Sequence, residues 1–229
     1  IIAAPDHSFD ANLTIFPDKQ VADYRSNITG QPDSINIRKQ QMDTRGSDIS
    51  FIIDQLEKLQ NGSIKSTLNG KLDLQKIAVA GHSYGGSTAT VAAHKDERIK
   101  ACAVLDSWLS PVPEPIISAG IHVPFLFMGR PTWEGSDYPG NYPRLDSLLA
   151  HSSEPKYRMV IKNTLHQDYT DIPLFSPIIE YVMQVGDLSP EISLTLINRL
   201  THGFLDKHLL SRNGKKFDQI LMNNLIIRF

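Results

Sequence analysis

Ser83 is the residue whose surroundings most strongly suggest chemistry. It stands in Gly81-His-Ser-Tyr-Gly85, which matches the Gly-x-Ser-x-Gly pattern of a nucleophilic serine on a sharp turn between a strand and a helix. A serine hydroxyl is a weak nucleophile until a base takes its proton, so a histidine held by a carboxylate is needed as well. The pattern therefore predicts a nucleophile whose two partners lie elsewhere in the chain.

The residues around the serine are those that such a turn requires. An apolar, β-rich run precedes it from Lys76, and small residues follow it from Gly86. We expect Gly81 and Gly85 both to be required, because side chains two positions either side of the serine would collide with neighbouring backbone. The following helix would point its N-terminus at the serine, and the Tyr84 amide would then donate to an oxyanion. A glycine-rich turn without catalytic function is the alternative.

The chain has eight histidines, and His166 is the best candidate for the base. It follows an apolar strand late in the chain, where the order serine, acid, histidine places it. His82, inside the turn, and His7, after the first apolar run, are expected to line a substrate pocket. The other histidines are expected to lie in helices or loops away from the site: His94, His122, His151, His202 and His208.

Two positions compete for the acid that orients the histidine. Asp106 ends the apolar run that follows the serine turn, and Glu134 or Asp137 comes after the next run. All of these positions follow strands at the same edge of the predicted sheet. The residues alone therefore leave the choice open.

The elements that would position these residues alternate between strands and helices. Strands are expected at residues 1–5, from residue 76 into the serine turn, and at 99–105, 123–128 and 157–161. Such alternation is typical of an α/β protein with a mostly parallel sheet and helices on both faces. The carboxyl ends of its strands would bring Ser83, Asp106, the Trp133 loop and His166 to one edge.

The connecting segments have distinct patterns. Proline, glycine, asparagine and aspartate predict irregular structure from Asn12 to Asp33. Helical spacing of apolar residues follows over residues 35–60, with a break near Gly46. Late in the chain, Ser189 followed by proline predicts the start of a packing helix.

Composition gives limits rather than an assignment. The chain has 229 residues, of which 41% are hydrophobic, and this suits a single α/β domain over residues 1–229. A net charge of −2 with mixed signs gives no indication of a nucleic-acid partner. The one cysteine, Cys102, lies in an apolar run and is expected to be buried and inert. The spacing of histidines and carboxylates predicts no metal site, and no cofactor is expected.

Three motifs together resemble the platelet-activating-factor acetylhydrolase family, the calcium-independent phospholipase-type serine esterases of the α/β-hydrolase fold. They are Gly81-His-Ser-Tyr-Gly-Gly86, Val104-Leu-Asp-Ser-Trp108 and Thr164-Leu-His-Gln-Asp168. The resemblance extends over most of the chain to about residue 208. It implies that Ser83 is the nucleophile, Asp106 the acid and His166 the base, and that Trp108 lines the acyl pocket. Ser107, where alanine is common in the family, and Tyr84, where phenylalanine is, depart from its pattern.

The resemblance implies hydrolysis of carboxylic esters through an acyl-enzyme. The expected substrates are short or oxidised acyl esters of phospholipids, such as platelet-activating factor, or small soluble esters. Peripheral membrane contact would accompany a phospholipid substrate. A cutinase-like polyester hydrolase and a non-catalytic hydrolase-fold binding protein are the alternatives. The sequence leaves the compartment open, with a secreted or extracytoplasmic location slightly favoured.

The count of strands leads to one further expectation. The serine turn follows the second predicted strand here, whereas it follows the fifth of eight in a full α/β-hydrolase. The N-terminal strands, including the one whose loop supplies a second oxyanion amide, are therefore expected to be missing from these residues. We expect this chain to be the C-terminal portion of a longer protein, from about the fourth strand onward.

Overall fold

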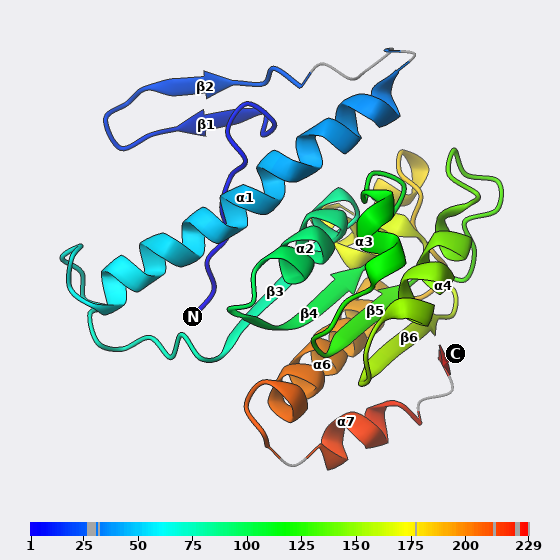
Figure 1. Cartoon of the computed structure of the whole chain (residues 1–229). Helices are drawn as coiled ribbons and strands as arrows, with labels where there is room; N and C mark the ends of the chain where they lie inside the picture. Colours follow the sequence, from blue (N-terminus) through cyan, green and yellow to red (C-terminus); the bar gives the residue numbers. More distant parts are fainter. Residues whose placement is uncertain (27–30, 32, 177, 213, 223–224, 229) are drawn as a thin grey trace. The chain divides into compact units, whose positions relative to one another are not determined.

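The computed structural model describes residues 1–26, 31, 33–176, 178–212, 214–222 and 225–228. The chain divides into two compact units, Ile1–Leu72 and Asp73–Phe229 (Figure 1). The expectation of a single domain stays a prediction. No helix among the described residues has the length and apolar character needed to cross a membrane.

The first unit consists of a hairpin and a long helix. Strands β1 (Leu13–Ile15) and β2 (Val21–Asp23) pair in antiparallel fashion, and α1 spans Ser34–Gln60. The prediction of irregular structure from Asn12 to Asp33 is therefore wrong at the hairpin, and residues 27–30 and 32 of that stretch lie outside the described part of the chain. Helix α1 also continues through Gly46, because one glycine lowers helix stability by only about 1 kcal/mol.

The predicted strand at residues 1–5 is not present. These residues have no regular secondary structure, and Ile1 and Ile2 are 84% and 93% exposed. The apolar run has the composition of a buried strand, but a strand also needs a hydrogen-bonded neighbour, and composition cannot supply one. Within the first unit, the described strand pairing is between β1 and β2 alone.

The second unit is built on a five-stranded sheet in the order β3-β4-β5-β6-β7. The first four strands are parallel: β3 (Ile77–His82), β4 (Ile99–Leu105), β5 (Phe125–Gly129) and β6 (Lys156–Ile161). These bounds lie within two residues of the predicted ones. The sequence missed β7 (Ile226–Arg228), which pairs antiparallel to β6. Three residues are too few to show an alternating pattern.

Helices cover both faces of this sheet (Figure 1). On one face, alternate residues of β4, β5 and β6 pack against α6 (Pro190–His208) and α7 (Lys215–Ile220), with Phe204 and Phe217 fully buried. On the other, α2 (Tyr84–Lys95) packs on β3 and β4, and Tyr142 of α4 (Asn141–His151) contacts Phe127 edge-on. The short helix α3 (Glu114–Ala119) packs against α4. The predicted α/β architecture, mostly parallel with helices on both faces, is confirmed.

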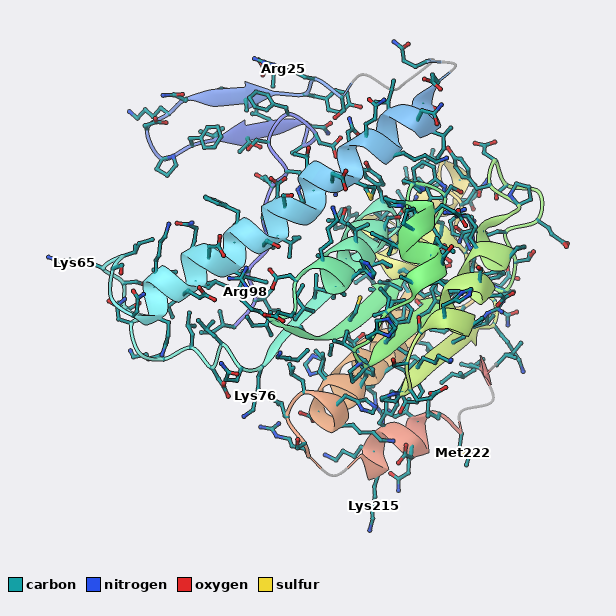
Figure 2. The ribbon with its side chains drawn as sticks, viewed as in Figure 1. Arg25, Lys65, Lys76, Arg98, Lys215 and Met222 are labelled. Atoms are coloured by element: carbon teal, nitrogen blue, oxygen red, sulfur yellow. The ribbon has the colours of Figure 1, made fainter. Side chains whose placement is uncertain are left out.

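The predicted start of the late packing helix agrees with the structure. Ser189 caps α6 by accepting a hydrogen bond from the Ile192 amide. The turn from α2 into β4 is closed by Arg98, labelled in Figure 2, which donates two side-chain hydrogen bonds of 2.9 and 2.7 Å to the Asp96 carboxylate. Cys102 is fully buried in β4, and burial raises the pKa of its thiol. The carboxyl ends of β3 to β6 then carry the candidate site.

Candidate active site

Ser83 occupies the turn between β3 and α2 in a strained conformation. Its φ and ψ are 54° and −119°, in a region that L-residues rarely adopt. Such strain persists where the surroundings over-determine it, and here both flanks are regular elements. The serine side chain is thereby presented at the carboxyl edge of the sheet.

The close backbone approach at this turn involves Gly81 and Gly86. A Cβ on Gly81 would overlap the carbonyl of Gly85, and one on Gly86 would lie 2.6 Å from Cβ of Ser107. A Cβ on Gly85 would meet nothing within 4 Å. The expectation that Gly85 is required is therefore wrong, because its missing side chain would point into open space.

We predict opposite outcomes for alanine at the two glycines that flank the serine. Gly81→Ala forces backbone apart and should destabilise the protein by more than about 4 kcal/mol. Gly85→Ala lies in the first turn of α2 and should change stability by less than about 1 kcal/mol, with alanine the better helix former. Urea unfolding of both variants checks this, and a similar loss in both would contradict the geometry.

His166 connects the serine to an acid. Its Nε2 lies 2.9 Å from Oγ of Ser83, and its Nδ1 lies 2.6 Å from Oδ2 of Asp106. The two ring nitrogens thus face two different partners, so an imidazole protonated at Nδ1 donates to the carboxylate and can accept the serine proton. The structure brings the three predicted residues together from the ends of β3, β4 and β6.

Asp106 is fully buried and tightly held. Its Oδ1 accepts a hydrogen bond of 3.1 Å from the Arg130 amide, and the Nε of Arg130 lies 3.3 Å from Oδ2. A Cβ on Gly129 would lie 3.0 Å from Oδ1, so glycine permits this close approach of β5 to the carboxylate. The competing carboxylates, Glu134 and Asp137, are exposed. The structure therefore places Asp106, and neither competitor, beside His166.

Backbone hydrogen bonds join the turn that carries Ser83 to the residues on either side of Asp106. The Ser83 amide donates to the Leu105 carbonyl at 3.0 Å, and the Trp108 amide donates to the Ser83 carbonyl at 3.1 Å. Asn141, fully buried at the start of α4, accepts from the Leu109 amide at 2.7 Å and donates to the Ser107 carbonyl at 2.9 Å. These bonds hold the residues on both sides of Trp108.

Asp168 fixes the turn that carries His166, and sequence reasoning did not single it out. Its Oδ2 accepts from the amides of Leu165 at 2.6 Å and Gly186 at 2.7 Å. The side chain is 1% exposed, and burial raises its pKa. The signal available in the sequence was its place two residues after the histidine. Asp168 therefore joins the two ends of the segment from Leu165 to Gly186.

The side chain of His82 contacts the backbone carbonyl of the base, His166. Its Nε2 lies 3.1 Å from the His166 carbonyl, and the two rings are 4.6 Å apart. Burial, with a smaller contribution from the charge of His166, lowers the pKa of His82 to about 4. The neutral ring can donate its Nε2 proton to that carbonyl. Its predicted contact with substrate stays a prediction.

Aromatic side chains gather beside the serine. The Trp108 ring lies 5.8 Å from Tyr84 and 4.4 Å from Tyr138, which sequence reasoning missed. All three are partly exposed, so they can contact a bound molecule. His7 belongs to the first unit, where its Nδ1 lies 2.7 Å from Oδ2 of Asp48. Its predicted pocket role stays a prediction.

Comparisons with known proteins agree with this architecture. The ferulic acid esterase from Streptomyces cinnamoneus superposes with a TM-score of 0.75 at 22% identity, covering 98% of this chain and 64% of that one. A sequence model of the family "Platelet-activating factor acetylhydrolase, isoform II" matches residues 10–224. The platelet-activating factor acetylhydrolase of Canis lupus familiaris is 28% identical over 96% of this chain and 52% of its own, and that of Bos taurus 32% identical over 66% and 33%.

A parallel sheet with a serine on the turn after β3 and a histidine after β6 defines an α/β-hydrolase. Within that class, the chain belongs to the platelet-activating factor acetylhydrolase, isoform II, family. It spans about half the length of the curated relatives it matches, 52% in the case of the dog protein. Among the described residues, no group of three histidine, cysteine or carboxylate side chains is placed to hold a metal ion.

Proposed function

We propose that this chain carries the catalytic residues of a serine-dependent carboxylic ester hydrolase. One observation carries the proposal: His166 lies 2.9 Å from Oγ of Ser83 and 2.6 Å from Oδ2 of Asp106. Both distances suit hydrogen bonds: the first can pass the hydroxyl proton to the imidazole, and the second holds the imidazole in the orientation that this transfer needs. Family membership supports the same reaction.

Each residue has one role in the proposed reaction. Ser83 Oγ attacks the ester carbonyl while His166 Nε2 takes its proton, and the same nitrogen then gives that proton to the leaving alcohol. The acyl group remains on Ser83 until a water, deprotonated by His166, hydrolyses it. Asp106 keeps the Nδ1 proton in place and stabilises the imidazolium that forms in each half of the reaction.

Tyr84 is the proposed oxyanion donor. Its amide is the first of α2, so the N-terminal end of the helix dipole supports negative charge there. One such donor is worth about 3 kcal/mol of barrier. The amide belongs to the residue after the nucleophile, which is the usual position of one oxyanion donor in this fold.

The proposed substrates are short or oxidised acyl esters of phospholipids, such as platelet-activating factor, or small soluble esters. The names of the curated relatives support the first, and the partly exposed Trp108, Tyr138 and Tyr84 would contact the bound ester in either case. His166 is 23% exposed, so the base is open to a substrate and to water.

A serine-reactive phosphonate tests the proposal directly. We expect one adduct on Ser83 in the folded protein, located by mass spectrometry of peptides, and none after Ser83→Ala. Turnover of p-nitrophenyl esters from acetate to laurate would then give the chain-length preference. A folded protein without an adduct would favour the non-catalytic binding protein, and turnover of polyester films but not of soluble esters would favour the cutinase-like alternative.

We also propose peripheral membrane contact through the segment between Asp171 and Gln184. Its exposed apolar residues include Leu174 at 52%, Phe175 at 76%, Ile178 at 63%, Tyr181 at 79%, Val182 at 72% and Met183 at 36%. Residues 163–198 contain no lysine or arginine. Contact would therefore depend on apolar burial rather than on anionic lipid.

Binding to vesicles checks this contact. We expect co-sedimentation with phosphatidylcholine vesicles that hardly changes when phosphatidylserine is added, and a several-fold weaker association after Phe175→Ser with Val182→Ser. Met222→Ser, at another residue that is 75% exposed and labelled in Figure 2, is the matched control. Binding that requires anionic lipid, or that survives the double substitution, would contradict the proposal.

A further inference from the structure

Arg130 follows β5 directly and belongs to no motif. Its side chain is 9% exposed and lies between two groups of the site. On one side, Nε is 3.3 Å from Oδ2 of Asp106; on the other, Cζ is 3.9 Å from the centroid of the Trp133 ring. A buried arginine placed this way is both a counter-charge and a packing surface.

The Trp133 indole extends this contact to the base. It is 4% exposed and meets the His166 ring edge-on, with 5.8 Å between the ring centroids. The guanidinium therefore touches the acid directly and reaches the base through one aromatic ring. Asp106 and His166 are therefore both in contact with the stacked pair of Arg130 and Trp133.

We infer that Arg130 is a positioning residue, which supplies the positive charge that keeps Asp106 a carboxylate beside a neutral His166 and holds Trp133 against the His166 ring. The inference rests on the proposed function. It assigns no contact with substrate to Arg130.

The reason is the full burial of Asp106. A buried carboxylate needs a compensating positive charge, and in the resting site that charge comes either from a guanidinium or from a protonated imidazole. With Arg130 present, His166 is free to be neutral and to accept the serine proton. Without it, Asp106 would retain the imidazolium, and the base would become available only at higher pH.

The other titratable groups around the pair do not supply this charge. Burial lowers the pKa of His82 to about 4, so its ring is neutral at pH 7. Tyr142, Tyr169 and Asp168 cannot be cations, because a phenol or a carboxyl group is neutral when protonated; burial raises the pKa of each and so favours that neutral form. Arg158 is a cation near Tyr142, but its guanidinium pairs with Asp146 and lies over the Tyr142 ring. Among the described residues, Arg130 is the cation that lies against Asp106 itself.

Two substitutions separate charge from packing. Arg130→Gln removes the charge, and we expect the acidic limb of kcat/KM against pH to move up by about one pH unit. The value of kcat/KM should then fall about tenfold at pH values well below the midpoint of the limb and less than about threefold well above it. Arg130→Lys keeps the charge but cannot stack flat on the indole, so the limb should stay in place while kcat falls by a similar factor at every pH.

Arg212→Gln is the matched control, since it removes one charge from the surface pair with Asp206 and should leave the limb unmoved. A loss in Arg130→Gln that is equal at all pH values would overturn the inference, because a purely structural role predicts that pattern. Should Arg130→Gln fail to fold, Arg130→Lys decides: wild-type kcat, or a displaced limb, would count against the assignment.

A readout that needs no turnover separates this inference from the proposed function. NMR signals of the His166 ring, followed against pH, should show protonation persisting to higher pH in Arg130→Gln than in the wild-type protein. Absence of turnover and of a Ser83 adduct in the wild type would end the proposed function only. Superimposable NMR titrations of His166 in the two proteins would end the inference only.

Discussion

Ser83→Ala is expected to lower kcat by about a million-fold while leaving the fold intact. The hydroxyl that forms the acyl-enzyme is gone, and the methyl side chain of alanine keeps the same backbone at φ 54°. The residual rate would come from the oxyanion donor and binding alone. Steady-state kinetics with a p-nitrophenyl ester, together with thermal unfolding, measures both parts of the expectation.

The controls for this prediction lie within the same site. His166→Ala should cost nearly as much, and the double variant little more than either single one, because the members of a triad act as a unit. Ser107→Ala is the matched serine control, since the buried Ser107 hydroxyl has no hydrogen-bond partner among the residues that the structure describes. Turnover near the wild-type rate in Ser83→Ala would end the proposed mechanism.

Asp106→Asn is expected to lower kcat by about ten-thousand-fold. The Arg130 amide donates to Oδ1, so the carbonyl oxygen of the new amide would stay there and its NH₂ would face Nδ1 of His166. That group donates where the carboxylate accepted, which moves the imidazole proton to Nε2. The base would then present a proton, and not a lone pair, to Ser83.

Glu134→Gln is the comparison that gives this prediction its discriminating power. Glu134 is exposed in the loop after β5, and its substitution should change kcat less than about threefold. The two variants are compared at saturating substrate and several pH values. A large loss in Glu134→Gln with a small one in Asp106→Asn would assign the acid to the loop after β5.

The sequence by itself determined the elements whose signals are local. The strands at 77–82, 99–105, 125–129 and 156–161 are apolar runs between turn residues, and the Ser189 cap with a following proline marks the start of α6. Ser83 was identifiable for the same reason, because a turn of five residues carries its own conformational requirement. By contrast, residues 1–5 have a strand's composition and no strand structure, since pairing is not a local property.

Tertiary structure decided which residues meet at the edge of the sheet. Asp106 and Glu134 both follow strands there, and the residues alone did not separate them; only the arrangement of the chain buries Asp106 against His166 and leaves Glu134 in solvent. The same holds for the contact of Arg130 with Asp106 and that of Asp168 with Gly186, which join residues 24 and 18 positions apart in the chain. Contacts between residues so far apart in the chain depend on which strands pair in the sheet, and no spacing pattern within a single element encodes strand order.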